Sequence, residues 1–400
     1  MVQTSAHEDG AASGPGVGAS SVLLLSMRHL SRLVGYCAAY EFEDIVAHLT
    51  GADVLAPTDQ RGLERSRRIY KATRLLTGSR RLADSLRPRR AANESTKRHD
   101  LFLAVFNHPY ELFALDAVAG WRSRCRVAAC YLVEAWEGRL PTYLLELLRD
   151  FDHVFVGVRG TIERTAQVTG RPCSYLPMGV DTLRFRPLRA ESRRAIDICG
   201  IGRRSNVTHD ALLRLAEDKG LFYFYDTVAQ TPHERGLLRQ VTFQVTDHRE
   251  HRLLLSNILK RTRFFITNRA HADQPAWTRG VDEIAARFYE GAAAGAIMIG
   301  DPPETDDFRE QFGWPDSVVR MSFDAPDVAD LILQLDGDPG RTARIRRDNM
   351  TNALLRHDWV YRLRTVLETL GVPLPPPLAA REQALKTLAD ETATSSIEVS

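Results

Sequence analysis

The sequence is poor in cysteine, in long apolar runs and in net charge. Its five cysteines show neither a CxxC pair nor zinc-ligand spacing, and an odd number without such a framework favours a reducing, cytoplasmic compartment. No apolar run approaches the roughly 20 residues that a membrane-spanning helix needs. The formal net charge is only +2, which excludes a protein that binds polyanions over its whole surface.

What is present is typical of a folded, globular chain. The hydrophobic share of 44% and the charged share of 26% are those of globular proteins, and 400 residues suggest two domains or one large one. The two ends differ from the rest. Residues 1–20 are small, glycine-rich and polar, without the basic start of a signal peptide, and predict a disordered leader. Three consecutive prolines and a Ser/Thr/Glu-rich end predict a disordered tail over 375–400.

One segment, residues 61–98, departs from the balanced charge of the chain. It holds thirteen arginines and lysines against three acidic residues, with leucines at intervals. This pattern predicts a basic amphipathic region. It would be either a solvated surface helix or a contact with an anionic membrane surface or a phosphorylated acceptor. Nucleic acid is not expected, because Tyr70 is the only aromatic residue among these cations.

Apolar strand-length runs alternate with helical patterns in two successive sets. The first set extends from 22–26 to 173–177, and the second from 195–200 to 317–321. Alternation of this kind predicts parallel sheets covered by helices. We therefore expect an α/β protein of two Rossmann-like, doubly wound domains that face a cleft, an N-terminal domain over 21–187 and a C-terminal domain over 188–374. Ligands of such sheets lie at the carboxyl ends of the strands.

The most informative stretch runs from Arg279 to Gly300. Gly280 loosens the backbone, Asp282 can cap a helix of small residues, and Gly295 ends that helix before a buried strand. Asp282 and Glu290 are eight positions apart. This spacing can direct two hydrogen-bond acceptors into one cleft, where they could hold sugar hydroxyls.

This stretch resembles the donor site of retaining GT-B glycosyltransferases, the group-1 and family-4-like set. Its amino-acid sequence is most similar to the spore-maturation (CgeB-like) branch of that set. In that set an acidic residue, seven others and a Glu precede a Gly and an apolar strand. Residues 176–187, with Gly179, Val180 and Asp181, resemble the segment before the interdomain linker. The resemblance implies a hexosyltransferase-like enzyme that moves a sugar from a nucleotide-sugar donor, with retention and with neither a metal nor another cofactor. The N-terminal domain would hold the acceptor and the C-terminal domain the donor.

The resemblance also implies roles for individual residues. Glu290 would accept the ribose hydroxyls, and Asp282, or Glu283 in its place, the sugar hydroxyls. Arg203 and Arg204 would face the diphosphate. Gly200, Gly202 and Gly280 are further candidates, as positions where the backbone approaches the donor. His108, at the carboxyl edge of the first sheet, is another. Glu134, after the next strand, is a weaker candidate.

Other interpretations stay open. The acids of the central helix could be merely solvated. The same fold also houses nucleotide-sugar epimerases, and a non-catalytic protein that binds nucleotides or anionic lipid would share these features. The acidic residues Asp301, Glu304, Asp306 and Asp307 are expected to form a solvated face rather than a metal site.

Overall fold

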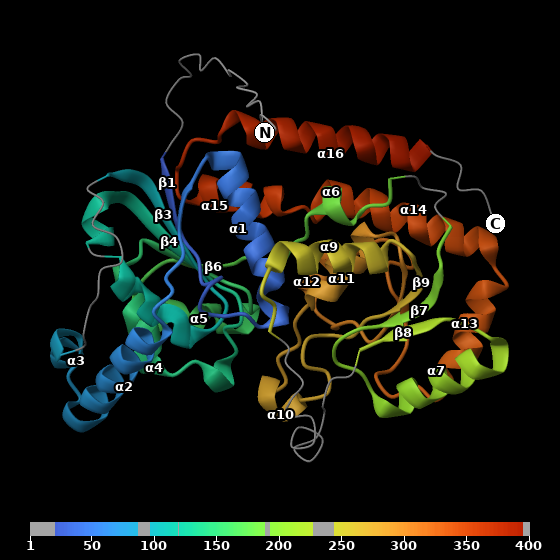
Figure 1. The fold of residues 1–400 in the computed structure, drawn as a ribbon, viewed down its shortest axis with the longest axis horizontal. Coiled ribbons are helices and arrows are strands. Elements are labelled where there is room, and N and C mark those ends of the chain that lie inside the picture. Colours follow the sequence, from blue (N-terminus) through green and yellow to red (C-terminus); the bar gives the residue numbers. More distant parts are fainter. Residues whose placement is uncertain (1–20, 87–96, 119, 189–192, 227–243, 395–400) are drawn as a thin grey trace, which may run out of the picture.

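Two parallel sheets form the framework of the protein (Figure 1). The computed structural model describes residues 21–86, 97–118, 120–188, 193–226 and 244–394. The first sheet has the strand order β2-β1-β3-β4-β5-β6 and the second the order β11-β10-β9-β7-β8. All pairings between neighbouring strands are parallel. The predicted fold class, two Rossmann-like α/β domains, is confirmed.

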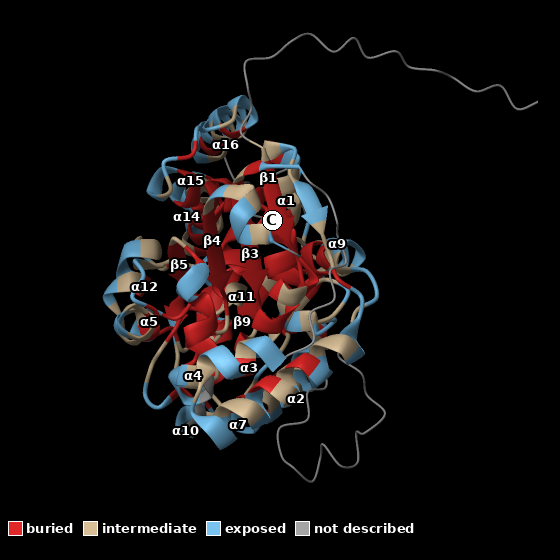
Figure 2. Ribbon diagram, turned by 90° about the vertical axis from the view of Figure 1, so that its left-hand side faces the viewer, coloured by how far each residue is buried: buried red, intermediate tan, exposed pale blue. Residues whose placement is uncertain are grey.

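The strands coincide with the apolar runs of the sequence. The first sheet contains β1 (Val22–Leu25), β2 (Asp53–Leu55), β3 (His99–Phe106), β4 (Cys125–Leu132), β5 (His153–Val156) and β6 (Cys173–Tyr175). The second contains β7 (Ile196–Gly200), β8 (Tyr223–Tyr225), β9 (Thr262–Ile266), β10 (Ile297–Gly300) and β11 (Val319–Arg320). Figure 2 shows central strands of both sheets as buried, with exposed helices around them.

Helices cover both sheets. Those of the first half are α1 (Cys37–Thr50), α2 (Gln60–Thr77), α3 (Arg80–Leu86), α4 (Thr142–Leu145), α5 (Ile162–Thr169) and α6 (Thr182–Phe185), with 3-10 helices η1 (Val34–Tyr36), η2 (Pro109–Ala117), η3 (Trp121–Arg124), η4 (Glu137–Arg139), η5 (Glu146–Asp150) and η6 (Arg159–Thr161). Those of the second half are α7 (Asn206–Lys219), α9 (His248–Leu259), α10 (Pro275–Thr278), α11 (Ala286–Ala293), α12 (Asp306–Gln311) and α13 (Val328–Asp336). Three more follow, α14 (Pro339–Arg356), α15 (Trp359–Thr369) and α16 (Pro376–Thr394).

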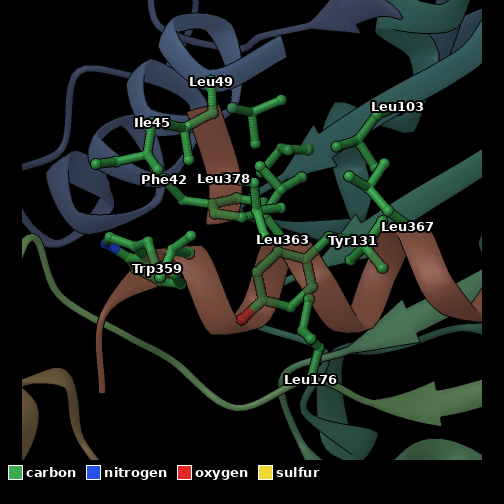
Figure 3. Packing of buried hydrophobic residues seen from close by; sticks show 14 of the residues in the cluster. Phe42, Ile45, Leu49, Leu103, Tyr131, Leu176, Trp359, Leu363, Leu367 and Leu378 are labelled. Atoms are coloured by element: carbon green, nitrogen blue, oxygen red, sulfur yellow. The ribbon is translucent and has the colours of Figure 1, made fainter. Parts of the chain in front are cut away.

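The C-terminal helices return to the first domain, and the expectation of a disordered tail is wrong for residues 376–394. Trp359, Leu363 and Leu367 of α15 pack with Phe42 of α1 in one buried cluster (Figure 3). Leu378 of α16 completes that cluster. The prolines that suggested a tail stand at the start of α16, where proline is tolerated because the first N–H groups of a helix have no partner within it.

The central stretch folds as helix, turn and strand, but its start differs from the prediction. Helix α11 begins at Ala286 with Ala285 as its N-cap and no side-chain cap, so Asp282 does not cap it. Gly295 follows the helix with a φ of +62°, as predicted. A Cβ on Gly291 would lie 2.8 Å from the Met298 sulfur. The small residues therefore let α11 lie directly against β10.

The predicted leader, residues 1–20, lies outside the described residues, as do 87–96 of the basic segment. Among the described helices, none is both long and apolar enough to cross a membrane.

Candidate functional site

A cavity of about 560 Å³ lies between the two domains. Its walls are loops at the carboxyl ends of strands in both sheets, together with residues of α1, α9 and α11. From the first domain come residues 33–36, His108, Val133, Glu134 and Trp136. From the second come 201–203, 266–271, the start of α11 and Glu290. Both sheets thus present the edge at which a doubly wound fold binds its ligands.

Glu290 lies on the wall of this cavity and is almost fully buried. One of its oxygens accepts a short hydrogen bond from Nη1 of Arg252, and the other accepts one from Nη1 of Arg287 at 2.5 Å. Burial acts to raise the pKa of Glu290, but the two arginines outweigh it and lower the pKa below its ordinary value. Glu290 is therefore an ionised acceptor whose position is set by two cations.

The two candidates for the first acid lie in different environments. Glu283 is buried and lines the cavity. It accepts hydrogen bonds from the hydroxyl of Tyr175 at 2.5 Å and the backbone N–H of Arg159 at 3.1 Å, both in the first domain. Asp282 is not among the lining residues, its side chain is 39% exposed, and it pairs with Arg269 at 3.1 Å. The structure therefore brings Glu283, and not Asp282, to the cavity beside Glu290.

The Gly-x-Gly-Arg-Arg segment after β7 is only partly directed at the cavity. Gly202 and Arg203 line it, whereas Gly200 and Arg204 do not. Arg203 pairs with Asp273 at 2.9 Å. Arg204 donates to the backbone carbonyl of Asp226, with its guanidinium over the Tyr225 ring. Arg203 is the better placed of the two arginines to meet an anion in the cavity.

His108 reaches the cavity from the carboxyl end of β3. Its Nδ1 accepts from the backbone N–H of Tyr110, and its own backbone N–H donates to Glu111, so that it caps η2. The neighbouring Glu134 also lines the cavity and pairs with His271 of the second domain at 3.6 Å. Both predicted residues of the first domain therefore lie at the cleft.

Gly280 does not line the cavity, in contrast to the prediction that its backbone amide helps to bind the donor. It is exposed and has a φ of +77° in the turn after α10. The helix N-terminus that does face the cavity is that of α11, at Ala285, Ala286 and Arg287. The difference follows from the later start of this helix, since only its first turn presents unpaired N–H groups.

Sequence reasoning missed the arginines that hold Glu290. Arg252 is 1% exposed, and its Nε and Nη2 donate to both oxygens of Glu41 on α1, at 3.0 and 2.9 Å. Glu41 also accepts from Nε1 of Trp359 and from the backbone N–H of Asp181. One carboxylate of the first domain thus contacts α9 of the second domain, the segment before the interdomain linker, and α15. The only sequence signal for Arg252 is an arginine on an otherwise inward-facing stripe of α9.

Cationic side chains slightly outnumber carboxylates around the cavity. The lining residues include Arg203, Arg252, Arg269 and Arg287 against Glu134, Glu283 and Glu290. His251 lines it too, and burial together with Arg287 and Arg252 lowers its pKa to about 4, so this ring is neutral at pH 7. Within the described part of the chain, no group of three or more His, Cys, Asp or Glu could hold a metal ion. Of the expected acidic face, Glu304 and Asp306 are exposed, whereas Asp301 pairs with Arg269 and Asp307 with Arg159.

Comparison with known proteins agrees with this architecture. Residues 243–368 match the family described as Glycosyl transferase-like. An alpha-glucosyltransferase, solved with UDP and a 13-mer DNA containing an HMU base, is 11% identical with a TM-score of 0.51, over 88% of this chain and all of that one. Alr3699/HepE of Anabaena, in complex with UDP, is 12% identical with a TM-score of 0.48, over 88% and 99% of the two chains. AviGT4, a glycosyltransferase involved in Avilamycin A biosynthesis, is 13% identical with a TM-score of 0.44, over 88% and 97%. No curated protein matches the chain in sequence.

The fold is thus that of the GT-B glycosyltransferases, two Rossmann-like domains around a cleft. The matched segment contains Arg252, Glu283 and Glu290, which line the cavity, whereas Arg203 on the same wall lies outside it. The prediction of a glycosyltransferase enzyme is confirmed at the level of this domain. The assignment to the spore-maturation branch stays a prediction.

Proposed function

We propose that this chain transfers a sugar from a nucleotide-sugar donor to an acceptor, with retention at the anomeric carbon and without a metal ion. The observation that carries the proposal is Glu290, an ionised, buried carboxylate on the wall of a two-domain cavity, inside the segment that matches a glycosyl transferase-like family. The proposed partners are the donor, an acceptor of unspecified class and an anionic membrane surface in contact with the basic segment.

Each part of the donor meets a different part of the wall in this proposal. Glu290 accepts hydrogen bonds from the ribose hydroxyls, and Glu283 takes the place of Asp282 beside the transferred sugar. Arg203 and the backbone N–H groups at the start of α11 face the diphosphate, where negative charge grows as the glycosidic bond breaks. His108 and Glu134 border the acceptor side. Support comes from the lining of the cavity by all of these groups.

The first test measures UDP binding to the Glu290→Gln variant by calorimetry. UDP is the probe because the solved alpha-glucosyltransferase with the same fold contains it. Hydrogen bonds to a charged acceptor contribute about 1.5–3 kcal/mol each, so the loss of charge should weaken UDP about tenfold to a hundredfold. The matched control is Asp282→Asn, an equal change of charge on an acid that does not line the cavity. Equal losses in both variants, or none in Glu290→Gln, would refute the placement.

The second test separates the diphosphate from the nucleoside. Arg203→Ala should weaken UDP by about tenfold or more, because an ion pair to a phosphate is lost, and should leave uridine unchanged. Arg204→Ala is the control, since that guanidinium lies against Tyr225 and outside the cavity lining. If Arg203→Ala weakens both ligands equally, the diphosphate does not lie beside it.

Product analysis then distinguishes the reaction classes. A transferase forms a glycoside only when an acceptor is present, an epimerase alters the sugar nucleotide without one, and a binding protein leaves it intact. Proton NMR of the product's anomeric centre decides between retention and inversion. Unchanged turnover in the presence of a chelator is expected for a reaction that needs no metal ion.

A further inference from the structure

The helical hairpin of α2 and α3 carries a strong local charge. Residues 60–86 contain eight arginines and lysines against two acids, a net charge of +6. The whole chain carries only +2, so the remainder is net negative. The hairpin lies at the edge of the first domain, at the lower left of Figure 1.

The outward cations of α2 lie on one stripe of the helix. Arg61, Arg65 and Arg68 are separated by four and three positions, and Leu75 and Leu76 continue the same stripe two turns later. All five side chains are exposed. The opposite face holds Ser66 and Tyr70, which are buried against the domain. The orientation of the stripe is therefore fixed by packing, with the arginines towards solvent.

Four leucines on the two helices of the hairpin are exposed. Leu75 is 71% exposed and Leu76 is 85% exposed at the end of α2. Leu82 and Leu86 of α3, which packs on α2, are 42% and 56% exposed. A folded monomer gains nothing from four leucines placed in water next to a row of arginines, so the pattern indicates a partner with both an apolar and an anionic part.

Inward and outward cations differ in their partners. Arg74 and Arg80 turn inward and pair with Glu146 at 3.1 Å and Asp84 at 3.3 Å. In the described part of the chain, the exposed Arg61, Arg65 and Lys71 have no carboxylate within ion-pair distance. Of the stripe itself, Arg68 pairs with the exposed Glu64 at 3.8 Å. The fold thus pairs its inward cations, Arg74 and Arg80, and leaves Arg61 and Arg65 of the outward stripe without a described carboxylate partner.

We propose that this face docks on an anionic lipid bilayer, with the arginine stripe against the headgroups and the exposed leucines in the acyl boundary. A basic amphipathic helix gains both apolar burial and electrostatic attraction at such a surface. Nucleic acid would satisfy the arginines but not the leucines, and Tyr70, which could stack on a base, is buried.

The hairpin is also joined to the wall of the cavity. Helix α2 packs on η2, whose N-cap His108 lines the cavity. The guanidinium of Arg67 lies 5.3 Å from the centroid of the Tyr110 ring, which stacks on His108. A docked hairpin would therefore hold the first domain's wall of the cavity close to the bilayer.

The test is co-sedimentation of the full chain with phosphatidylcholine vesicles, with and without phosphatidylserine. We expect binding that depends on phosphatidylserine and weakens as salt is raised. Each cation near an anionic surface accounts for about fivefold in partitioning, so Arg61→Ser with Arg65→Ser should weaken it on the order of twentyfold. Leu75→Ser with Leu76→Ser should weaken binding at every salt concentration, because it removes apolar insertion.

The matched control changes an exposed arginine of α7 and an exposed leucine of the linker, Arg214→Ser with Leu188→Ser. It should bind vesicles like the unchanged chain, and all variants should keep the same melting temperature and UDP affinity. Equal binding to both kinds of vesicle overturns the proposal. So does vesicle binding that neither the double arginine change nor the double leucine change weakens. Binding to a single-stranded oligonucleotide without binding to vesicles overturns it in favour of nucleic acid. None of these outcomes bears on the donor site, which UDP binding tests separately.

Discussion

Replacement of Arg252 by methionine should separate the buried interdomain ion pair from the exposed ones. Arg252 of α9 is 1% exposed and donates to both oxygens of Glu41 and to Glu290. Methionine keeps an unbranched chain of similar length but no donor. Removal of one partner of a buried ion pair costs about 3–5 kcal/mol, because the remaining carboxylate stays desolvated. Here two carboxylates lose their shared cation, so we expect a loss in unfolding free energy at the upper end of that range.

Arg249→Met is a control on the same helix. Arg249 also joins α9 to α1, through two hydrogen bonds to Asp44 at 2.8 and 3.0 Å, but its side chain is 64% exposed. An exposed ion pair contributes only about 0–1 kcal/mol. Urea unfolding of both variants measures the difference. A cost for Arg249→Met equal to that for Arg252→Met would refute the argument that burial sets the strength of this contact.

The Arg252 variant should also weaken ligand binding. This effect acts through Glu290 and needs no direct contact between Arg252 and the ligand. Without Arg252, Glu290 keeps only Arg287 as a cation partner, and its carboxylate is no longer held from two sides. We expect UDP affinity to fall in Arg252→Met and to stay unchanged in Arg249→Met. In the Glu290→Gln background the further effect of Arg252→Met on UDP binding should be much smaller, since the two residues act together.

Two further predictions concern stability. Gly291→Ala should cost about 1–3 kcal/mol in urea unfolding, because its Cβ would lie 2.8 Å from the sulfur of Met298; Gly340→Ala, with nothing nearer than 3.8 Å at the start of α14, should instead stabilise by about 0.5–1 kcal/mol. The same sign for both would contradict the packing argument. Burial raises the pKa of Glu111 from 4.5 to about 7, so the folded chain holds this proton more tightly than the unfolded chain, and stability contributed by Glu111 falls as pH rises through that window. Glu111→Gln should remove this fall in stability, which is on the order of 3 kcal/mol. Melting temperatures at about pH 5 and about pH 8 measure it. The prediction is refuted when the variant and the unchanged chain lose the same stability between these two pH values.

Local patterns sufficed for most of the framework. The strands were predictable because a parallel strand buried on both faces is a continuous apolar run, as in β3 and β10. The turn at Gly295 was predictable because few residues other than glycine adopt its φ of +62°. The tail predicted from composition is wrong over 376–394, where Leu378, Leu385 and Ala389 recur at helical spacing and are buried in α16. The amino-acid composition of a segment reports how polar it is, whereas the spacing of its apolar residues shows whether they share one face of a helix.

The candidate site could be predicted only in outline. Its location at the carboxyl ends of strands follows from strand order, and the roles suggested for Glu290 and Arg203 follow from resemblance. The choice of Glu283 over Asp282 required the exact start of α11, because a shift of one residue along the chain turns a side chain to another direction. The residue at which a helix begins depends on tertiary packing, and the residues next to it in the sequence do not determine that packing.

The amino-acid sequence by itself therefore determined two βα domains and an acid-bearing helix in the second of them. Only the tertiary structure decided which charges meet. Glu41 and Arg252 are 211 positions apart, and Trp359 reaches the same carboxylate from 318 positions away. Contacts over such separations depend on how the two sheets and the returning C-terminal helix pack. Because a buried carboxylate must find its partners wherever the fold provides them, the partners of Glu41 could be identified only once the chain was folded.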